Sequence, residues 1–448
     1  MRLNVLLAAS CCALLSAGFF AAVGAADDPP PPADSTTTTT TTPTTTTSTI
    51  TTTTPTTTTT TTTSDVPEIV WGAADDASKF ADDGGASFYG QLKGANLTQN
   101  RWTLVFDPSS PTTIEELPFL ERSAPQAQAA GVRIILVLYS LKASVHDPGQ
   151  FCAWAKLVAQ TVGQWGIHDF VVGNEVNTRL YWAPQKDGRN RDIAAPSYVA
   201  LLATCYDALH SVDPEANVIG FGLSPRASTS QSNDPLVFLR DAGAAYRASG
   251  RKAPIMDQLS VHPYPNPSSP TDGPDVGYPN PDRFGVPNLD RVKQAVYDAF
   301  NGTAQPTTLN GLTFVIDEIG WQTDTNGLPG YVNPENVRVI SEQKQAAYIN
   351  TMVTRYFACD PTVVGVQLFL LVDERYRNGR NESGQYVGGG WQSGLVAADG
   401  QPKSSYSKAA ALFGAGRAAC TGSMIAWSPS KVGKIAKPKQ PRKKAKRR

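Results

Sequence analysis

Between about residues 67 and 420, short runs of β-branched and aliphatic residues alternate with longer stretches in which apolar residues recur every three or four positions. Eight of the short runs predict β-strands, because each is nearly continuous in apolar character and is followed by turn-forming residues. They cover residues 68–74, 100–106, 132–139, 169–174, 217–223, 256–262, 312–318 and 363–371. Strands of this composition are typical of a parallel sheet that is buried on both faces.

The longer stretches predict helices, several of which begin at Ser, Asp or Pro and end at Gly. They cover residues 114–131, 149–166, 196–212, 235–250, 289–300, 342–357 and 404–416. Eight strand–helix units in about 350 residues favour an α/β fold, a (β/α)8 TIM barrel with enlarged loops. A doubly wound open sheet is the alternative, but no Gly-rich phosphate-binding loop follows the first strand.

The first 26 residues predict a secretory signal peptide. Arg2 precedes an apolar run, and small residues surround Ala25 and Ala26, where we expect cleavage. A membrane anchor is the alternative, although the positive start and the small residues at the exit favour cleavage. No other apolar run approaches the ~20 residues of a membrane helix. We therefore expect the mature chain to be secreted and extracellular.

Two segments of biased composition flank the predicted barrel domain, residues 67–422. Residues 27–66 consist mostly of Thr, Pro and Ser and predict a disordered stalk, because they offer almost no apolar surface to bury. Residues 423–448 predict a disordered basic tail, although the formal net charge of the whole chain is zero. The tail is either a solvated extension or a means of retention on an anionic cell-wall polymer. We expect no specific nucleic-acid partner and a monomer.

Four cysteines remain once the signal peptide is removed: Cys152, Cys205, Cys359 and Cys420. Export to an oxidising compartment favours disulfides, and the lack of a CxxC pair argues against zinc. Cys152 and Cys205 lie on neighbouring helices of the predicted outer ring, and Cys359 and Cys420 follow the last two predicted helices, 342–357 and 404–416. The barrel therefore predicts the pairs Cys152–Cys205 and Cys359–Cys420.

The candidate catalytic residues are two glutamates. Glu175 follows the fourth predicted strand and Glu318 ends the seventh. Catalytic residues of such barrels lie at the C-terminal ends of the strands, so the two carboxylates are expected to face each other across one mouth. Such a pair suits the cleavage of a glycosidic bond, in which one carboxyl group donates a proton and the other is ionised.

The motifs around these residues resemble those of clan A glycoside hydrolases, with the cellulase-like family 5 and the xylosidase-like family 39 the most similar. Gly173-Asn174-Glu175 resembles the motif that ends strand four of that clan, and VIDEIGWQT (315–323) resembles its strand-seven motif. The resemblance implies a retaining enzyme in which Glu175 is the acid/base and Glu318 is the nucleophile.

Three further segments extend this resemblance. NRW with Arg101 is similar to strand two of the clan, SVHPY (260–264) to strand six, and residues 388–406 to the tail of strand eight. The implied substrate-binding residues are Arg101, Asn174, His262, Tyr264, Trp321 and Trp391. The sequence also departs from the clan: Val176 stands where Pro is common, Asp317 precedes Glu318, and Trp391 comes some twenty residues after the strand. Since neighbours on a strand point to opposite faces, Asp317 is expected to be a structural partner.

Each of these residues also has an ordinary structural interpretation. His262 could be a core histidine, Arg101 a salt-bridge residue, and the aromatic residues packing residues. The four histidines show no HxH or HExxH spacing and no cofactor motif is present, so we expect neither a metal nor a cofactor. The sequence predicts a secreted retaining glycoside hydrolase acting on a poly- or oligosaccharide. A non-catalytic cell-surface carbohydrate-binding module and a wall-glycan transglycosylase are the alternatives.

Overall fold

The structure is a computed structural model, and it describes residues 66–140, 147–325, 338–374, 379–380, 386–387 and 390–430. The predicted signal peptide, the predicted stalk up to residue 65 and residues 431–448 of the basic tail lie outside these residues. Within the described parts of the chain, no helix combines the length and the apolar character needed to cross a bilayer.

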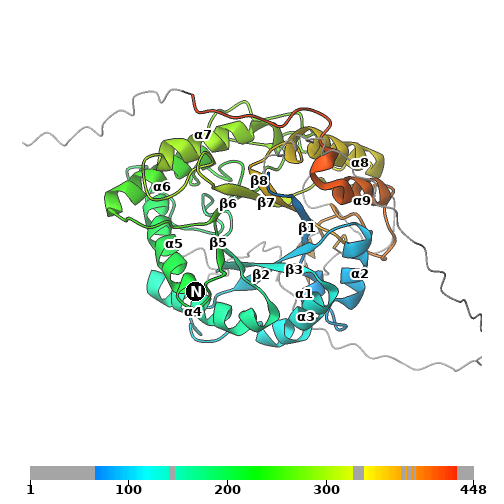
Figure 1. Cartoon of the computed structure of the whole chain (residues 1–448), viewed down its shortest axis with the longest axis horizontal. Helices are drawn as coiled ribbons and strands as arrows, with labels where there is room; N and C mark the ends of the chain where they lie inside the picture. Colours follow the sequence, from blue (N-terminus) through cyan, green and yellow to red (C-terminus); the bar gives the residue numbers. More distant parts are fainter. Residues whose placement is uncertain are drawn as a thin grey trace, which may run out of the picture. The chain divides into compact units, whose positions relative to one another are not determined.

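Eight parallel strands form a closed barrel in sequence order (Figure 1). They are β1 (Val70–Ala74), β2 (Gln99–Val105), β3 (Arg133–Tyr139), β4 (Asp169–Val172), β5 (Asn217–Leu223), β6 (Gln258–Val261), β7 (Thr313–Ile319) and β8 (Val363–Leu368). All eight predicted strands are confirmed. Because β8 pairs with β1, the sheet has no open edge, and the doubly wound alternative is wrong.

Helices surround the barrel (Figure 1). They are α1 (Ala77–Phe80), α2 (Ala86–Gly94), α3 (Leu117–Ala130), α4 (Pro148–Val162), α5 (Ala194–His210), α6 (Pro235–Ser249), α7 (Leu289–Phe300), α8 (Glu342–Thr351) and α9 (Tyr406–Ala415). Short 3-10 helices are η1 (Gly163–Trp165), η2 (Val286–Asn288) and η4 (Gly416–Ala419), and a π-helix, η3 (Met352–Phe357), follows α8. A separate two-stranded antiparallel sheet consists of β9 (Gly379–Arg380) and β10 (Tyr386–Val387). The sequence did not predict α1 or α2, since α1 is a single turn and α2 contains Gly90 and Gly94, which weaken a helical pattern.

The inside of the barrel is apolar in the middle and polar at the end where the strands begin. Ile135, Val137, Val171, Ile219 and Val315 pack together inside the barrel. The first residues of five consecutive strands then form a chain of polar contacts: Arg133, Asp169, Asn217, Gln258 and Thr313. These contacts tie the strands together at this end of the barrel and leave the opposite end for the functional residues.

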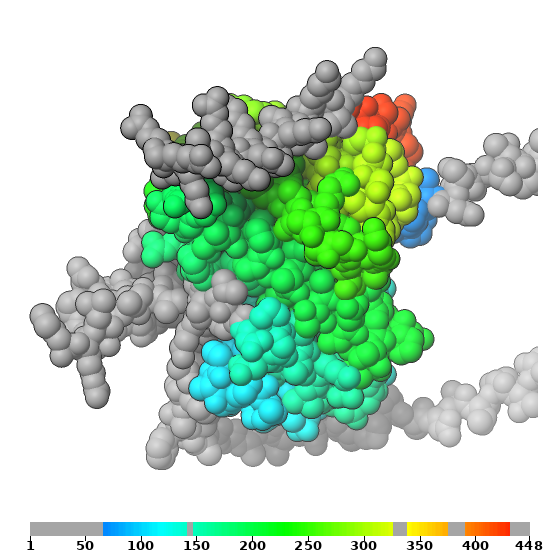
Figure 2. Space-filling model, turned by 90° about the vertical axis from the view of Figure 1, so that its left-hand side faces the viewer, coloured from blue at the N-terminus to red at the C-terminus, as the bar shows by residue number. Residues whose placement is uncertain are grey.

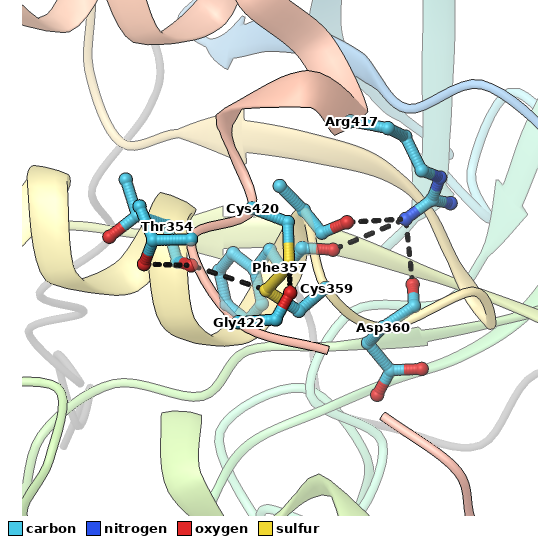
Figure 3. Close-up of a disulfide and its surroundings, with 9 residues drawn as sticks. Thr354, Phe357, Cys359, Asp360, Arg417, Cys420 and Gly422 are labelled. Atoms are coloured by element: carbon cyan, nitrogen blue, oxygen red, sulfur yellow. Dashed lines mark hydrogen bonds between the residues drawn. A yellow bond between two sulfur atoms is a disulfide. The ribbon is translucent and has the colours of Figure 1, made fainter. Parts of the chain in front are cut away.

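Both predicted disulfides are present. Cys152 on α4 is bonded to Cys205 on α5, and Cys359, just after η3, is bonded to Cys420, just after η4. Beside the second bond, the Arg417 guanidinium donates to the carbonyl oxygens of Phe357 and Asp360 at 3.3 and 2.8 Å (Figure 3). The disulfide and Arg417 therefore fasten the end of the barrel domain to the turn between η3 and β8.

The chain keeps contact with the barrel beyond residue 422, where the sequence places the start of the basic tail. The backbone N–H of Ile425 donates to the Cys359 carbonyl at 2.7 Å. Trp427 packs against Tyr297 of α7 with their ring centroids 6.4 Å apart, and Ser430 donates to the Gln294 side chain at 2.9 Å. Residues 423–430 thus belong to the folded domain.

Candidate active site

The polar residues singled out in the sequence meet at the C-terminal ends of the strands. Arg101 lies in β2, Asn174 and Glu175 follow β4, and Glu318 lies near the end of β7. Nη2 of Arg101 lies 2.9 Å from Oε1 of Glu318 and donates to Oδ1 of Asn174 at 2.9 Å. The barrel thus brings together groups from three strands that are far apart in the sequence.

Glu318 is held from two sides. Arg101 pairs with one carboxylate oxygen, and the Tyr264 hydroxyl donates to the other at 3.1 Å. Burial and the neighbouring charge of Glu318 raise the pKa of Tyr264 well above its usual value, so this hydroxyl stays protonated as a donor. The side chain of Glu318 keeps an exposed fraction of 13%. It is therefore fixed in place and still reachable from the cavity.

A buried histidine lies between the two glutamates. Nδ1 of His262 is 3.6 Å from Oε1 of Glu175 and 3.5 Å from Oε2 of Glu318. These two carboxylate oxygens are consequently no more than about 7 Å apart. Both carboxyl groups thus approach the same imidazole nitrogen.

The imidazole of His262 carries a positive charge at neutral pH. Its burial alone would lower the pKa, but the charges of Asp317 and Glu318 outweigh this effect and raise the pKa to about 10. Nε2 forms an ion pair with Oδ1 of Asp317 at 2.8 Å. The ring is fully buried behind the glutamates and is not part of the cavity wall.

Asp317 and Glu318 are consecutive residues, yet both reach Arg101 and His262. The reason is a bulge, because the three steps along β7 from Ile316 to Ile319 oppose only two steps along β8, from Val366 to Leu368. The bulge breaks the alternation of side chains, so Asp317 does not point away from Glu318 as a regular strand would require. Burial alone would raise the pKa of Asp317, but His262 and Arg101 lower it to about 2. Asp317 is thus a buried structural partner, on the same side as Glu318.

An unusual backbone conformation presents Glu175. Its φ of 42° lies in the left-handed region, which is rare for residues other than glycine and costs about 1–3 kcal/mol. The backbone N–H of Glu175 donates to the carbonyl oxygen of Gly222 at 2.8 Å. Gly222 lies in a second bulge, in β5, beside Phe221 with a φ of 80°. The backbone segments around Glu175 and Phe221, both with a non-glycine residue at positive φ, are therefore hydrogen-bonded to each other at the cavity.

A cavity of about 300 Å³ opens onto both glutamates. Among the sequence-predicted residues, Asn174, Tyr264, Trp321 and Trp391 border it together with Glu175 and Glu318, whereas Arg101 and His262 lie behind the wall. The other lining residues are Tyr181, Ser224, Pro225, Arg226, Ser228, Pro265, Pro267, Pro270, Tyr278, Gly320, Gln322, Arg338 and Phe369. Most of them come from the loops after β5, β6 and β7.

Trp391 reaches the cavity although it lies far beyond the end of β8 in the sequence. Its ring packs against Phe369 at 5.5 Å and Tyr264 at 6.4 Å between centroids. Phe369 directly follows β8, but it lies inside the longer strand predicted over 363–371, so sequence reasoning missed it. The three rings form an aromatic wall of the cavity beside Glu318.

Trp321 borders the cavity but is largely built into the wall. Its exposed fraction is 4%, its Nε1 donates to the Asp272 carbonyl at 2.9 Å, and its ring packs against Tyr348. Trp182, in the loop after β4, is part of the core and packs on Tyr198. Of the tryptophans near the site, Trp391 is thus the one whose ring is better exposed to a ligand.

A wider depression of about 780 Å³ lies between α5 and α6. The residues of these helices, in green, are on the face of the molecule shown in Figure 2. Small apolar side chains such as Ala200, Ala203 and Ala245 line much of it. No strand end reaches it, and none of the predicted site residues borders it. Within the described ranges, no group of three or more His, Cys, Asp or Glu residues is placed to hold a metal ion. The mouth of the barrel is therefore the candidate active site.

No family model and no curated protein matches this sequence. Among solved structures, a family 39 glycoside hydrolase from Bacteroides cellulosilyticus is similar with a TM-score of 0.51 and 17% identity over 78% of this chain and 64% of that one. A glucosidase from Croceicoccus marinus has a TM-score of 0.51 and 13% identity over 78% of this chain and 67% of that one. The chain thus spans less than two thirds of the length of the first protein. The likeness confirms the barrel fold that the motifs of clan A glycoside hydrolases implied.

Proposed function

We propose that the protein is a secreted, retaining glycoside hydrolase that cleaves O-glycosidic bonds of a poly- or oligosaccharide by double displacement. A barrel fold does not define a reaction, so the site has to support the proposal. The observation that carries it is the approach of Glu175 and Glu318 to the same nitrogen of His262, in a cavity with an aromatic wall. Two carboxyl groups in this arrangement match the needs of glycoside cleavage.

In the first step, Glu318 attacks the anomeric carbon while Glu175 donates its proton to the oxygen of the leaving sugar. The C–O bond breaks, its electron pair goes to that oxygen, and a covalent glycosyl–enzyme intermediate forms. In the second step, Glu175 takes a proton from water, whose oxygen attacks the same carbon and releases Glu318. Arg101 and Tyr264 hold the attacking carboxylate in position throughout.

The charges of the site are consistent with these roles. Arg101 and His262 are cationic, and Asp317 and Glu318 supply two negative charges. The cluster is therefore neutral when Glu175 carries a proton, which is the form that an acid catalyst needs at the start. When Glu175 gives up this proton, the nearby imidazolium of His262 stabilises the new carboxylate. We assign His262 a positioning role.

Asn174 and the aromatic wall would hold the sugar. Oδ1 of Asn174 accepts from Arg101, so its amide nitrogen remains to donate to a hydroxyl group next to the anomeric carbon. Hydrogen bonds to that hydroxyl strengthen in the transition state of glycosidases. Tyr264, Phe369 and Trp391 offer apolar ring surface to the carbon faces of the substrate.

The two alternatives predict different products. A carbohydrate-binding module would bind without releasing sugars, and it has no need for two facing carboxylates that are held by buried cations. A transglycosylase would use the same two glutamates with a sugar hydroxyl in place of water. Export is supported by the predicted signal peptide and by the two disulfides, and the basic tail supports retention on an anionic cell-wall polymer.

The deciding experiment is intact-mass analysis after incubation with 2-deoxy-2-fluoro glycosides of the gluco, xylo, manno and galacto series and of the matching uronic acids. We expect one stable adduct, located by peptide mapping on Glu318, and none in the variant Glu318→Gln. Hydrolysis that gives product of inverted configuration and no adduct would contradict retention. Saturable binding of a glycan without any product would favour the binding module.

A further inference from the structure

Arg226 is a part of the cavity that the proposed mechanism does not use. It lies in the loop after β5 and borders the same cavity as Glu175 and Glu318. The side chain is half-buried, and its positive charge lies close enough to the hydroxyl group of Tyr278, another residue of the cavity wall, to counter in part the effect of burial on the pKa of that hydroxyl. A permanent positive charge is therefore held on a wall residue of the candidate active site.

The described parts of the chain provide no carboxylate that pairs with Arg226. Its Nη1 donates to the carbonyl oxygen of Ala227 at 3.1 Å, which is a neutral acceptor. Asp234, the acidic residue of the same loop, forms an ion pair with Arg283, whose Nε lies 2.6 Å from Oδ1 of Asp234. The same carboxylate accepts a hydrogen bond from the backbone N–H of Ala227. Arg226 thus differs from Arg101, whose guanidinium is saturated by Asp317, Glu318 and Asn174.

The two glutamates of the cavity do not supply the missing partner either. Glu318 is held by Arg101 and Tyr264, and Glu175 lies next to His262. A half-buried guanidinium has five N–H donors, and its planar fork matches a carboxylate in two parallel hydrogen bonds. Arg338 adds a second cation to the cavity lining. The unused donors of the wall therefore fit an anion that arrives with the ligand.

We infer that the substrate carries a uronic acid, and that Arg226 binds the carboxylate of this sugar while Glu175 and Glu318 cleave the glycosidic bond beside it. The inference rests on the proposed function and narrows its substrate class. A neutral sugar would leave the guanidinium without an ionic partner and would gain only a hydroxyl contact from it. A uronate carboxylate replaces that contact by a charge-assisted, bidentate pair.

The test compares 4-nitrophenyl glycosides that differ only at C6: glucoside with glucuronide, and galactoside with galacturonide, in both anomeric forms. We expect the wild-type protein to prefer the uronide of a pair. Arg226→Gln should lower kcat/KM for the uronide roughly 10- to 100-fold, the loss of a charged hydrogen bond, and change it less than about threefold for the neutral partner. Arg226→Lys should recover part of the loss. Arg247→Gln, on the outer face of α6, is the matched control and should behave like the wild type.

A wild-type preference for the neutral glycosides, or an equal loss on both members of a pair in Arg226→Gln, would overturn the inference. A preference for a 6-sulfated glycoside over the uronide would overturn the assignment of a carboxylate.

A binding experiment separates this inference from the proposed reaction. Calorimetry with the Glu318→Gln variant compares the binding of glucuronate- and galacturonate-containing oligosaccharides with the binding of their carboxyl-reduced forms. The same comparison is then made with the double variant Glu318→Gln/Arg226→Gln. Tighter binding of the acidic forms that disappears with Arg226→Gln supports the inference, even if the wild type releases no product. Equal binding of both forms refutes it, even if the wild type hydrolyses a neutral glycan.

Discussion

Nη2 of Arg101 lies 2.9 Å from Oε1 of Glu318, and the neighbouring Nε of the same guanidinium lies 3.3 Å from Oδ2 of Asp317. One planar group thus binds two consecutive carboxylates, which the bulge in β7 turns to the same side. Arg101 also binds Asn174 from β4. A single side chain therefore links Glu318 to Asn174, the residue before Glu175.

Arg101→Lys should lower kcat about 100-fold and leave KM nearly unchanged. The ammonium of lysine is a point charge, so it cannot hold Glu318, Asp317 and Asn174 at once, and the geometry of attack is lost. Steady-state kinetics measure this split, with circular dichroism as the control for folding. A rise in KM at unchanged kcat would instead mean that Arg101 contributes only to ground-state binding.

His262 should make the protein less stable as the pH rises. Its pKa is 6.5 in the unfolded chain and about 10 in the fold, so its stabilising contribution is complete below pH 6.5 and is lost as the pH rises through 10. The loss should be on the order of a few kcal/mol. Urea unfolding between pH 6 and 10 should show this decline in the wild type and in His210→Gln, but not in His262→Gln. Parallel profiles for all three proteins would show that Asp317 and Glu318 do not hold the extra proton on His262.

At position 175, glycine should be more stable than alanine by about 0.5–1 kcal/mol, because alanine is strained at positive φ. Both variants, Glu175→Gly and Glu175→Ala, should lose activity. Denaturant unfolding compares them, and Glu121 in the exposed face of α3 provides the control. There the order should be reversed, with Glu121→Ala more stable than Glu121→Gly by about 1 kcal/mol. The same order at both positions would argue against strain at Glu175.

Lys403→Met should destabilise the fold by about 3–5 kcal/mol. The Lys403 ammonium binds Asp373 and the Thr323 hydroxyl at 2.7 Å, and both charged side chains are buried. The substitution leaves the carboxylate of Asp373 in the protein interior without its cation. Adding Asp373→Asn should recover part of the loss in urea unfolding. Arg355→Met, which removes the exposed pair with Asp275, should cost less than about 1 kcal/mol.

Each disulfide should contribute about 4 kcal/mol to the free energy of unfolding in the chain-entropy model, since the bonds close loops of 53 and 61 residues. Paired Cys→Ala variants, unfolded in urea without reductant, measure the two contributions separately. Dithiothreitol should destabilise the wild type but not the variant that lacks all four cysteines. An equal loss of stability in both proteins would show that dithiothreitol destabilises the fold by a process other than reduction of the two disulfides.

The barrel could be predicted from the sequence because its strands are buried on both sides. A run such as residues 132–139 is apolar at nearly every position, and it forms β3 almost as predicted. The same logic fails for α2, whose glycines and mixed surface give no clear helical period. The sequence also did not predict that the chain stays in contact with the barrel beyond residue 422, because the packing of Trp427 on α7 depends on a surface that only the fold creates.

The site was predictable where a residue directly follows a strand, as Glu175 and Asn174 do. Asp317 shows the limit, since a bulge is a property of the pairing of β7 with β8 and leaves no mark in β7 alone. Phe369 and Arg226 were missed for different reasons. Phe369 lies inside the apolar run 363–371, which predicted only a strand. Arg226 was missed because its lack of a carboxylate partner among the described residues depends on the pairing of Asp234 with Arg283, which only the structure shows.

The two disulfides join parts of the outer ring and the C-terminal segment, and the loops after β5 and β6 contain no cysteine. The covalent frame of the molecule is thus separate from the loops that line the cavity with Arg226 and Tyr278. Insertions or exchanges in these loops leave both cross-links untouched. The lining of the cavity can therefore be altered by exchange of these loops while the frame that holds the two glutamates is kept.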